Sequence, residues 1–181
     1  MPLSQPQART LQHSRDIILR GYEREDGSFD IEARLTDTKS YPLPNLDRGT
    51  LMPGEALHDM WIRLTVDADL LILSCEAVTD SSPYAICPDI APNFARLAGI
   101  RIGPGFNRAV KERVGGTEGC THLRELLAQM ATVAYQTLHS VRTRRRRESG
   151  EGEPPLSPAI IGTCHAYAPD SPVVRRRQGK G

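Results

Sequence analysis

The sequence predicts an α+β protein in which two antiparallel β-hairpins form one sheet and helices cover one face of that sheet. Two observations support this fold class. Short apolar or alternating segments separated by turn residues occupy the first half of the chain, whereas helical spacing of apolar residues occupies the second half. The strands also precede the helices instead of alternating with them, which favours an antiparallel sheet over a parallel one.

The first hairpin is expected from residues 16–24 and 29–36. Asp26 and Gly27 lie between these segments, and this dipeptide is a strong signal for a tight hairpin turn. In the second segment, apolar side chains alternate with polar ones, as in a strand that has one buried and one solvated face. Residues 1–14 are polar, and we expect them to form a loose lead into the first strand.

The second hairpin is expected from residues 57–66 and 70–78, which are again apolar on at least one face. His58 and Asp59 lie where its first strand begins. The preceding residues 41–56 contain three prolines and two glycines and are expected to form a long connecting loop. Loops of this length often carry function.

Three helices are expected in the second half of the chain. Two short ones, over residues 92–98 and 106–114, are each followed by a glycine, which commonly ends a helix. The third, over residues 121–142, is the longest and closes an α+β domain of residues 15–142. One stripe of apolar residues marks its buried side: Leu123, Leu126, Leu127, Met130, Val133, Ala134 and Leu138.

The composition indicates one globular domain with an uneven charge. Of the 181 residues, 39% are hydrophobic and 25% are charged, and the net charge is only +1. Residues 142–181 nevertheless carry nine basic and four acidic side chains. We expect residues 143–181 to form a basic, Pro-rich and partly disordered tail, in which the apolar segment 159–174 can dock on the domain.

This basic tail could contact an acidic partner, although a solvated tail without a partner explains the same charges. The arginine run at residues 144–147 contains no aromatic residues, so sequence-specific binding of nucleic acid is not expected. Otherwise the sequence does not identify a partner.

No apolar run approaches the roughly 20 residues that a membrane-spanning helix needs, and the N-terminal residues lack the apolar core of a signal peptide. We therefore expect a cytoplasmic protein whose four cysteines are reduced. Their spacing fits neither a C-x-x-C motif nor a zinc finger. The glycine-rich segments do not follow strands at Walker or Rossmann spacing, so no nucleotide cofactor is expected.

A glycine-rich turn before the long helix delivers Cys120 and His122 to the helix start, where unpaired backbone N–H groups favour a thiolate. Metal-binding residue types also lie at the ends of two other elements. Thiolate, imidazole and carboxylate together suit zinc or iron. We therefore expect a metal site formed by Asp59, Cys87, Cys120 and His122, with His58 as a weaker candidate.

Two other functions fit the same residues. Cys120 could be the nucleophile of a metal-free enzyme, with His122 or His58 as its base. Alternatively, the chain is a non-catalytic binding or accessory protein, in which Cys120 is a small buried apolar residue. The sequence leaves open whether the protein is an enzyme.

Four segments of the chain resemble an uncharacterised bacterial family called domain of unknown function 2889, which brings no established activity. The resemblance covers about residues 15–140. The segments are Arg20-Gly-Tyr-Glu-Arg-Glu-Asp-Gly, Asp30-Ile-Glu-Ala-Arg-Leu-Thr-Asp-Thr, His58-Asp-Met-Trp-Ile-Arg-Leu-Thr and Gly115-Gly-Thr-Glu-Gly-Cys-Thr-His-Leu-Arg-Glu-Leu.

The layout is also similar to that of NifU-like iron–sulfur scaffold proteins. In that family an aspartate follows a cysteine at the entry to a strand, another cysteine follows the next strand, and a His-Cys pair opens the last long helix. Asp59 and Cys87 match the positions of the aspartate and the second cysteine. Cys120 with His122 matches the helix-start pair in reversed order, and His58 replaces the first cysteine. The similarity implies metal binding, and the altered ligands favour a single ion over a cluster.

Overall fold

The computed structural model describes residues 3–152 and 156–178 and divides the chain into two compact units, Met1–Leu138 and His139–Gly181. The first unit contains a four-stranded sheet and the helices that cover it. The longest helix, α2 (Thr121–Glu148), begins in the first unit and ends in the second. Among the described residues, no helix is both long enough and apolar enough to cross a membrane.

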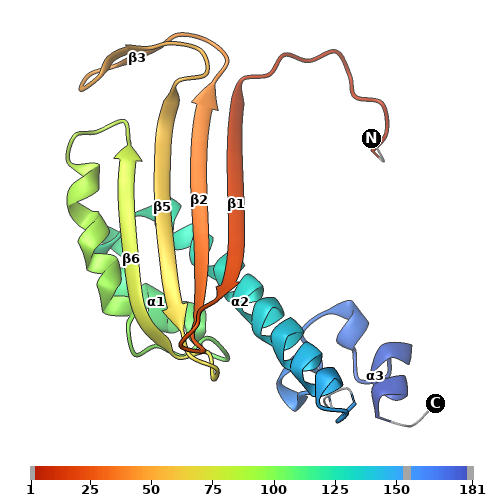
Figure 1. Ribbon diagram of the computed structural model, residues 1–181. Helices are drawn as coiled ribbons and strands as arrows, with labels where there is room; N and C mark the ends of the chain where they lie inside the picture. Colours follow the sequence, from red (N-terminus) through yellow and green to blue (C-terminus); the bar gives the residue numbers. More distant parts are fainter. Residues whose placement is uncertain (1–2, 153–155, 179–181) are drawn as a thin grey trace. The chain divides into compact units, whose positions relative to one another are not determined.

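The four strands of the sheet are β1 (His13–Glu23), β2 (Phe29–Lys39), β5 (Ala56–Val66) and β6 (Ile72–Ser81). They lie in the order β1-β2-β5-β6, and every neighbouring pair is antiparallel (Figure 1). The two predicted hairpins are therefore confirmed, and the pairing of β2 with β5 joins them into one sheet. This arrangement, together with the helices, confirms the predicted α+β fold class.

One face of the sheet forms the core of the first unit. In β2 every second side chain from Phe29 to Asp37 is buried, and β5 follows the same alternation from His58 to Leu64. Figure 1 shows α1 (Phe106–Val114) and the first turns of α2 on the same side of the sheet. The α2 side chains that complete this core are fully or almost fully buried: Leu123, Leu126, Leu127, Met130 and Ala134.

Strand β1 and helix α2 approach each other closely at Gly21. A Cβ atom on Gly21 would lie 2.0 Å from the Thr137 Oγ1 atom, so a side chain at this position would collide with the helix. The sequence provides a glycine where the helix crosses the strand, and this allows α2 to lie against the sheet.

The predicted loop of residues 41–56 contains a small hairpin instead of being irregular throughout. Strands β3 (Leu43–Asn45) and β4 (Gly49–Leu51) pair with each other in a separate two-stranded sheet. The Asn45 side chain accepts hydrogen bonds from the backbone N–H groups of Asp47 and Arg48, and Gly49 has a left-handed backbone. These turn contacts were not apparent from the density of prolines and glycines.

The helices follow the expected order with two differences in detail. The segment expected as a helix over 92–98 belongs to a longer 3₁₀ segment, η1 (Cys87–Leu97), in which the internal Pro92 lacks the N–H group that an α-helix needs. Helix α1 has the predicted bounds. Helix α2 continues to Glu148 rather than ending at Arg142, since arginine favours helix and Arg144 pairs with Glu148 one turn later.

The second unit contains short helical elements after α2: η3 (Pro158–Ile160), η4 (His165–Tyr167) and α3 (Pro172–Arg177). Ser171 caps α3 by accepting a hydrogen bond from the Val174 N–H group, and the following proline begins the helix. The predicted segment 159–174 therefore has local helical structure. Residues 153–155 and 179–181 of the predicted tail lie outside the described residues.

Candidate functional site

Three metal-capable side chains meet at one end of the buried face of the sheet. Asp37 of β2 lies directly opposite His58 of β5, and His122 approaches from the first turn of α2. One ligand atom from each of these residues lies within 4.8 Å of the others. Only 1% of Asp37 and 7% of His58 are exposed to solvent, so the group forms at the edge of the core.

The Asp37 carboxylate is surrounded by donors. Arg15 of β1 binds it in a bidentate pair, here called a fork, with Nε donating to Oδ1 at 2.8 Å and Nη2 donating to Oδ2 at 2.7 Å. His58 Nδ1 lies 2.9 Å from Oδ2, and His13 Nε2 lies 3.3 Å from Oδ1. Arg15 also reaches α2, since its Nη1 atom donates to Glu125 Oε2 at 3.3 Å. A buried carboxylate is stable here because its charge is paired and hydrogen-bonded.

The electrostatics of the site favour a charged carboxylate and neutral imidazoles. Burial by itself would raise the pKa of Asp37, but the hydrogen bonds and charge of Arg15, with those of His58, outweigh burial and lower it. The pKa of His58 is lowered by burial and by the neighbouring charge of His122. Burial and the charge of Arg15 lower the pKa of His122. Both imidazoles are therefore neutral at neutral pH.

The contact with Asp37 fixes which His58 nitrogen is free. A carboxylate only accepts hydrogen bonds, so His58 Nδ1 carries the proton and Nε2 presents a lone pair. The His58 ring stacks on the His122 ring, with centroids 4.0 Å apart and an interplanar angle of 35°. Among the described residues, no group hydrogen-bonds to His58 Nε2. This atom is free to bind an ion or accept a proton.

Cys120 lies beside the histidine pair. Its Sγ atom is 3.9 Å from His122 Nδ1 and 4.0 Å from the Met60 sulfur, and its side chain is half-buried. Gly119 shapes this turn, because a Cβ atom there would lie 2.1 Å from the carbonyl oxygen of Val114. The glycine-rich turn thus places Cys120 and His122 on the same side, although residues two apart within a helix would point apart.

The structure does not bring Asp59 to this group. Asp59 follows His58 in β5, so its side chain points to the opposite face of the sheet. There it accepts from Arg34 Nε at 2.9 Å and from Arg34 Nη2 at 2.6 Å. The Arg34 guanidinium also lies 4.6 Å from the centre of the Trp61 ring. The prediction placed two neighbouring strand residues in one site, and strand alternation separates them.

Cys87 is also outside the group. It is the first residue of η1 and is half-buried, and in the described part of the chain the ligand atoms close enough to share an ion belong to Asp37, His58 and His122. Of the expected set, this group contains His122 and the weaker candidate His58, and Cys120 lies beside His122 but outside the group.

Sequence reasoning missed Asp37, Arg15 and His13. A signal for Asp37 was available, because it occupies a buried position in the alternation of β2 after four apolar residues: Phe29, Ile31, Ala33 and Leu35. A carboxylate in such a position needs a buried partner. His13 was assigned to a loose lead, whereas β1 begins there.

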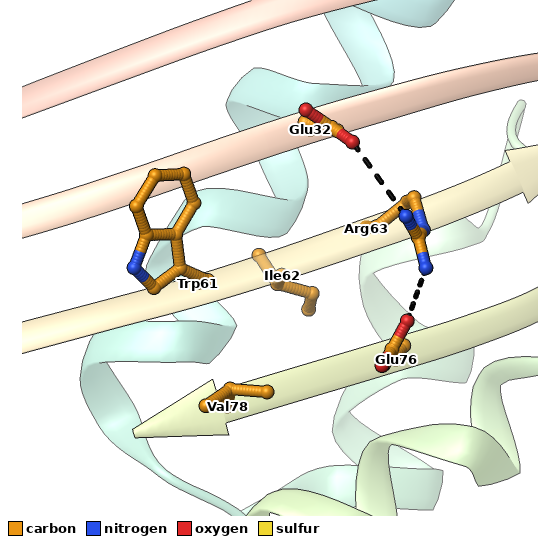
Figure 2. A pocket seen from close by; sticks show the side chains of 6 residues that line it. All are labelled: Glu32, Trp61, Ile62, Arg63, Glu76 and Val78. Carbon is orange, nitrogen blue, oxygen red and sulfur yellow. Dashed lines mark hydrogen bonds and ion pairs between the residues drawn. The ribbon is translucent and has the colours of Figure 1, made fainter. Parts of the chain in front are cut away.

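The other face of the sheet carries a shallow pocket lined by Glu32, Trp61, Ile62, Arg63, Glu76 and Val78 (Figure 2). Arg63 pairs with Glu32 at 3.8 Å on one side and with Glu76 on the other. Arg63 thus lies between two carboxylates from the neighbouring strands, which is ordinary cross-strand pairing. The buried face is thus the better candidate for chemistry.

The candidate site lies inside a region shared with other proteins. Residues 13–136 match the family described as "Protein of unknown function (DUF2889)", and this span includes every residue from His13 to Glu125 discussed above. No curated protein and no solved structure matches the chain, so the similarity to NifU-like proteins gains no support from a known structure. Because the family match covers more than half of the sequence, the protein belongs to the DUF2889 family.

Proposed function

We propose that this protein binds a divalent transition-metal ion, zinc or iron, at the buried end of its sheet, with His58 and His122 as nitrogen ligands. The observation that carries this proposal is that ligand atoms of Asp37, His58 and His122 lie within 4.8 Å of one another. Both histidines have lowered pKa values, so they are in the neutral form that binds metals. Imidazole nitrogen is a ligand that both metals accept.

The chemistry of such a site depends on how many positions the protein fills. An ion that keeps one position for water or substrate can activate water or polarise a carbonyl group, as in catalytic zinc sites. Two histidines and one further protein ligand would leave such a position. Metal-assisted hydrolysis is therefore the reaction class that this site would support in an enzyme.

The test is a metal-binding measurement on the purified chain and matched variants. We expect one equivalent of zinc or iron(II) to bind, measured by elemental analysis after dialysis and by calorimetric titration. His58→Gln and His122→Gln should each lose most of this affinity while keeping the wild-type circular dichroism spectrum. Asp59→Asn should bind like the wild type, because Asp59 lies on the opposite face.

Two results would reject the proposal. One is a wild-type protein that contains neither metal and takes up neither. The other is loss of binding in Asp59→Asn with full binding in both histidine variants, since that pattern would place the ion at Asp59 and away from the histidines.

A second candidate function is metal-free thiol chemistry, which the 3.9 Å distance between Cys120 Sγ and His122 Nδ1 favours. If the imidazole activates this thiol, His122→Gln should slow alkylation of Cys120 in metal-free protein, measured by mass spectrometry. An unchanged rate would argue against a nucleophilic role.

The basic second unit supports a third, non-catalytic role in binding an acidic partner. Arginines gather at the end of α2 and in α3, and this unit is the most basic part of the chain. Replacing Arg175, Arg176 and Arg177 with glutamine should reduce any salt-sensitive interaction in a pull-down. An unchanged interaction would remove α3 from this role. We also retain the proposal of a cytoplasmic location.

A further inference from the structure

Asp37 has little capacity left for a metal ion. Both of its oxygens accept hydrogen bonds from the Arg15 fork, and His58 and His13 approach the same two atoms. An ion that bound Asp37 directly would displace Arg15 or share its oxygens with a cation. Removing one partner of a buried ion pair is strongly unfavourable. Asp37 is therefore better suited to orient His58 than to bind the ion.

This role leaves a defined donor atom on His58. The carboxylate holds Nδ1–H, so the lone pair of Nε2 points away from Asp37. His58 is more than nine-tenths buried, and nothing in the described part of the chain hydrogen-bonds to Nε2. An ion between His58 and His122 would give this nitrogen a partner.

Cys120 lies outside the group of three whose ligand atoms are within 4.8 Å of one another, but it is the thiol beside His122 and can replace Asp37 in the ligand set when an ion draws the side chains together. Two ligands of a tetrahedral zinc ion, one sulfur and one nitrogen, lie about 3.5 Å apart when the bonds are roughly 2.3 and 2.0 Å long. The distance between Cys120 Sγ and His122 Nδ1 is 3.9 Å, which is long for a hydrogen bond but close to this separation. The Cys120 thiol also contacts the Met60 sulfur at 4.0 Å, and this neighbour brings no charge.

We infer that Cys120, His58 and His122 are the protein ligands of the ion and that Asp37, locked by Arg15, is a positioning residue outside the coordination sphere. This inference rests on the proposed function and deepens it, because it names the class of metal. One thiolate with two imidazoles suits zinc and similar borderline-soft ions, whereas magnesium, calcium and manganese prefer oxygen ligands. Three protein ligands are also the number found in catalytic zinc sites.

Cobalt(II) is the probe that separates this ligand set from the alternatives. It replaces zinc and gives an intense near-ultraviolet charge-transfer band only when a thiolate binds it. We expect the cobalt-loaded wild-type chain to show this band. Cys120→Ser should lose the band yet still bind cobalt through its histidines, and Cys87→Ser is the matched control that should keep it.

Asp37→Asn tests the positioning role. A residue that orients a ligand typically changes metal affinity by about 10- to 100-fold when it is replaced. We expect that loss in a chelator competition, with the charge-transfer band retained at saturating cobalt, because the thiolate is still bound. A purely structural role would change thermal stability without changing the affinity of the folded protein.

The outcomes distinguish the inference from the function on which it rests. If the wild-type chain takes up no cobalt or zinc, the proposed function fails. If cobalt binds without a thiolate band, or if the band persists in Cys120→Ser, the metal site stands and the ligand assignment is overturned. Unchanged affinity in Asp37→Asn would overturn the positioning role.

Discussion

Asp37 and Asp59 are each held by the fork of an arginine, yet they lie on opposite faces of the same sheet. The Arg15–Asp37 distances are 2.8 and 2.7 Å, and the Arg34–Asp59 distances are 2.9 and 2.6 Å, so the two ion pairs have nearly the same geometry. The Asp37 side chain is 1% exposed and that of Asp59 is 15% exposed.

Their neighbours differ more than their hydrogen bonds do. Asp37 has two histidines beside it, whereas the arginine of the Asp59 pair stacks on Trp61. On the solvated face, the neighbour of the ion pair is the Trp61 ring, which is not a metal ligand. On the buried face, the carboxylate of a similar ion pair holds one nitrogen of an imidazole, and the second nitrogen has no hydrogen bond in the described part of the chain. The arginine fork is thus structural on one face and orients a residue of the candidate site on the other.

The largest expected difference between the two faces is in stability. Asp37→Ala should lower the free energy of unfolding by about 3 kcal/mol, because it leaves Arg15 and His58 without their buried partner. Asp59→Ala should cost much less, since water can replace the carboxylate at an exposed arginine. Urea denaturation of the two variants measures the difference. Equal losses would mean that burial does not distinguish the two pairs.

A smaller loss is expected where the buried face meets α2. Gly21→Ala should destabilise the protein by about 1–3 kcal/mol, because the new Cβ would lie 2.0 Å from Thr137 Oγ1. Gly103→Ala is the matched control, since no atom lies within 4 Å of a Cβ built there and its backbone is not left-handed. Adding Thr137→Ala to Gly21→Ala should restore part of the loss. No recovery in the double variant would contradict a direct contact with Thr137.

The sequence predicted the architecture that separates these faces but not the group that forms on one of them. Alternation in residues 29–36 and 57–66 indicated which side chains share a face, and helical spacing indicated α1 and the start of α2. These signals are local, because each depends on residues within one element. The same alternation places His58 and Asp59 on opposite faces, so it already argued against the expected set.

The partners of His58 depend on pairings between elements. Asp37 lies opposite His58 only because β2 of the first hairpin pairs with β5 of the second in one register. A shift by one residue would exchange the faces of the whole strand. No short sequence motif predicts that register. Likewise, no motif predicts that Arg15 of β1 contacts both β2 and α2. The expected set therefore lacked the carboxylate that organises the group.

A pH titration of the metal-free protein provides a further test. The folded-state pKa values of His58 and His122 are lowered from 6.5, so the unfolded chain binds protons more readily than the folded one. Stability from these groups is present above the unfolded value and is lost as pH falls below about 6.5. Asp37 adds a further loss at lower pH, as the pH approaches its lowered pKa.

The measurement is the urea midpoint at a series of pH values between neutral and mildly acidic. The midpoint should fall with decreasing pH, and His122→Gln should make the fall shallower, because glutamine does not titrate. Asp59→Asn should leave the slope unchanged. A wild-type midpoint that rises with acidity over this range would show that the histidines are not held in the neutral form.

The mildest test compares the reactivity of two cysteines on the buried side of the sheet and leaves the stability of the protein unchanged. Cys75 of β6 is buried, and burial with the nearby charge of Glu76 raises the pKa of its thiol to about 12. Cys120 is half-buried beside His122. Iodoacetamide should therefore modify Cys120 in the native protein and modify Cys75 only after unfolding, as read by mass spectrometry of peptides.

Zinc added before the reagent should protect Cys120 and leave the exposed Cys164 reactive. Cys164 is the control, because its labelling reports any general loss of reagent. Protection confined to Cys120 would place the ion at this thiol. Equal labelling of Cys120 with and without zinc would show that the thiol does not bind the metal.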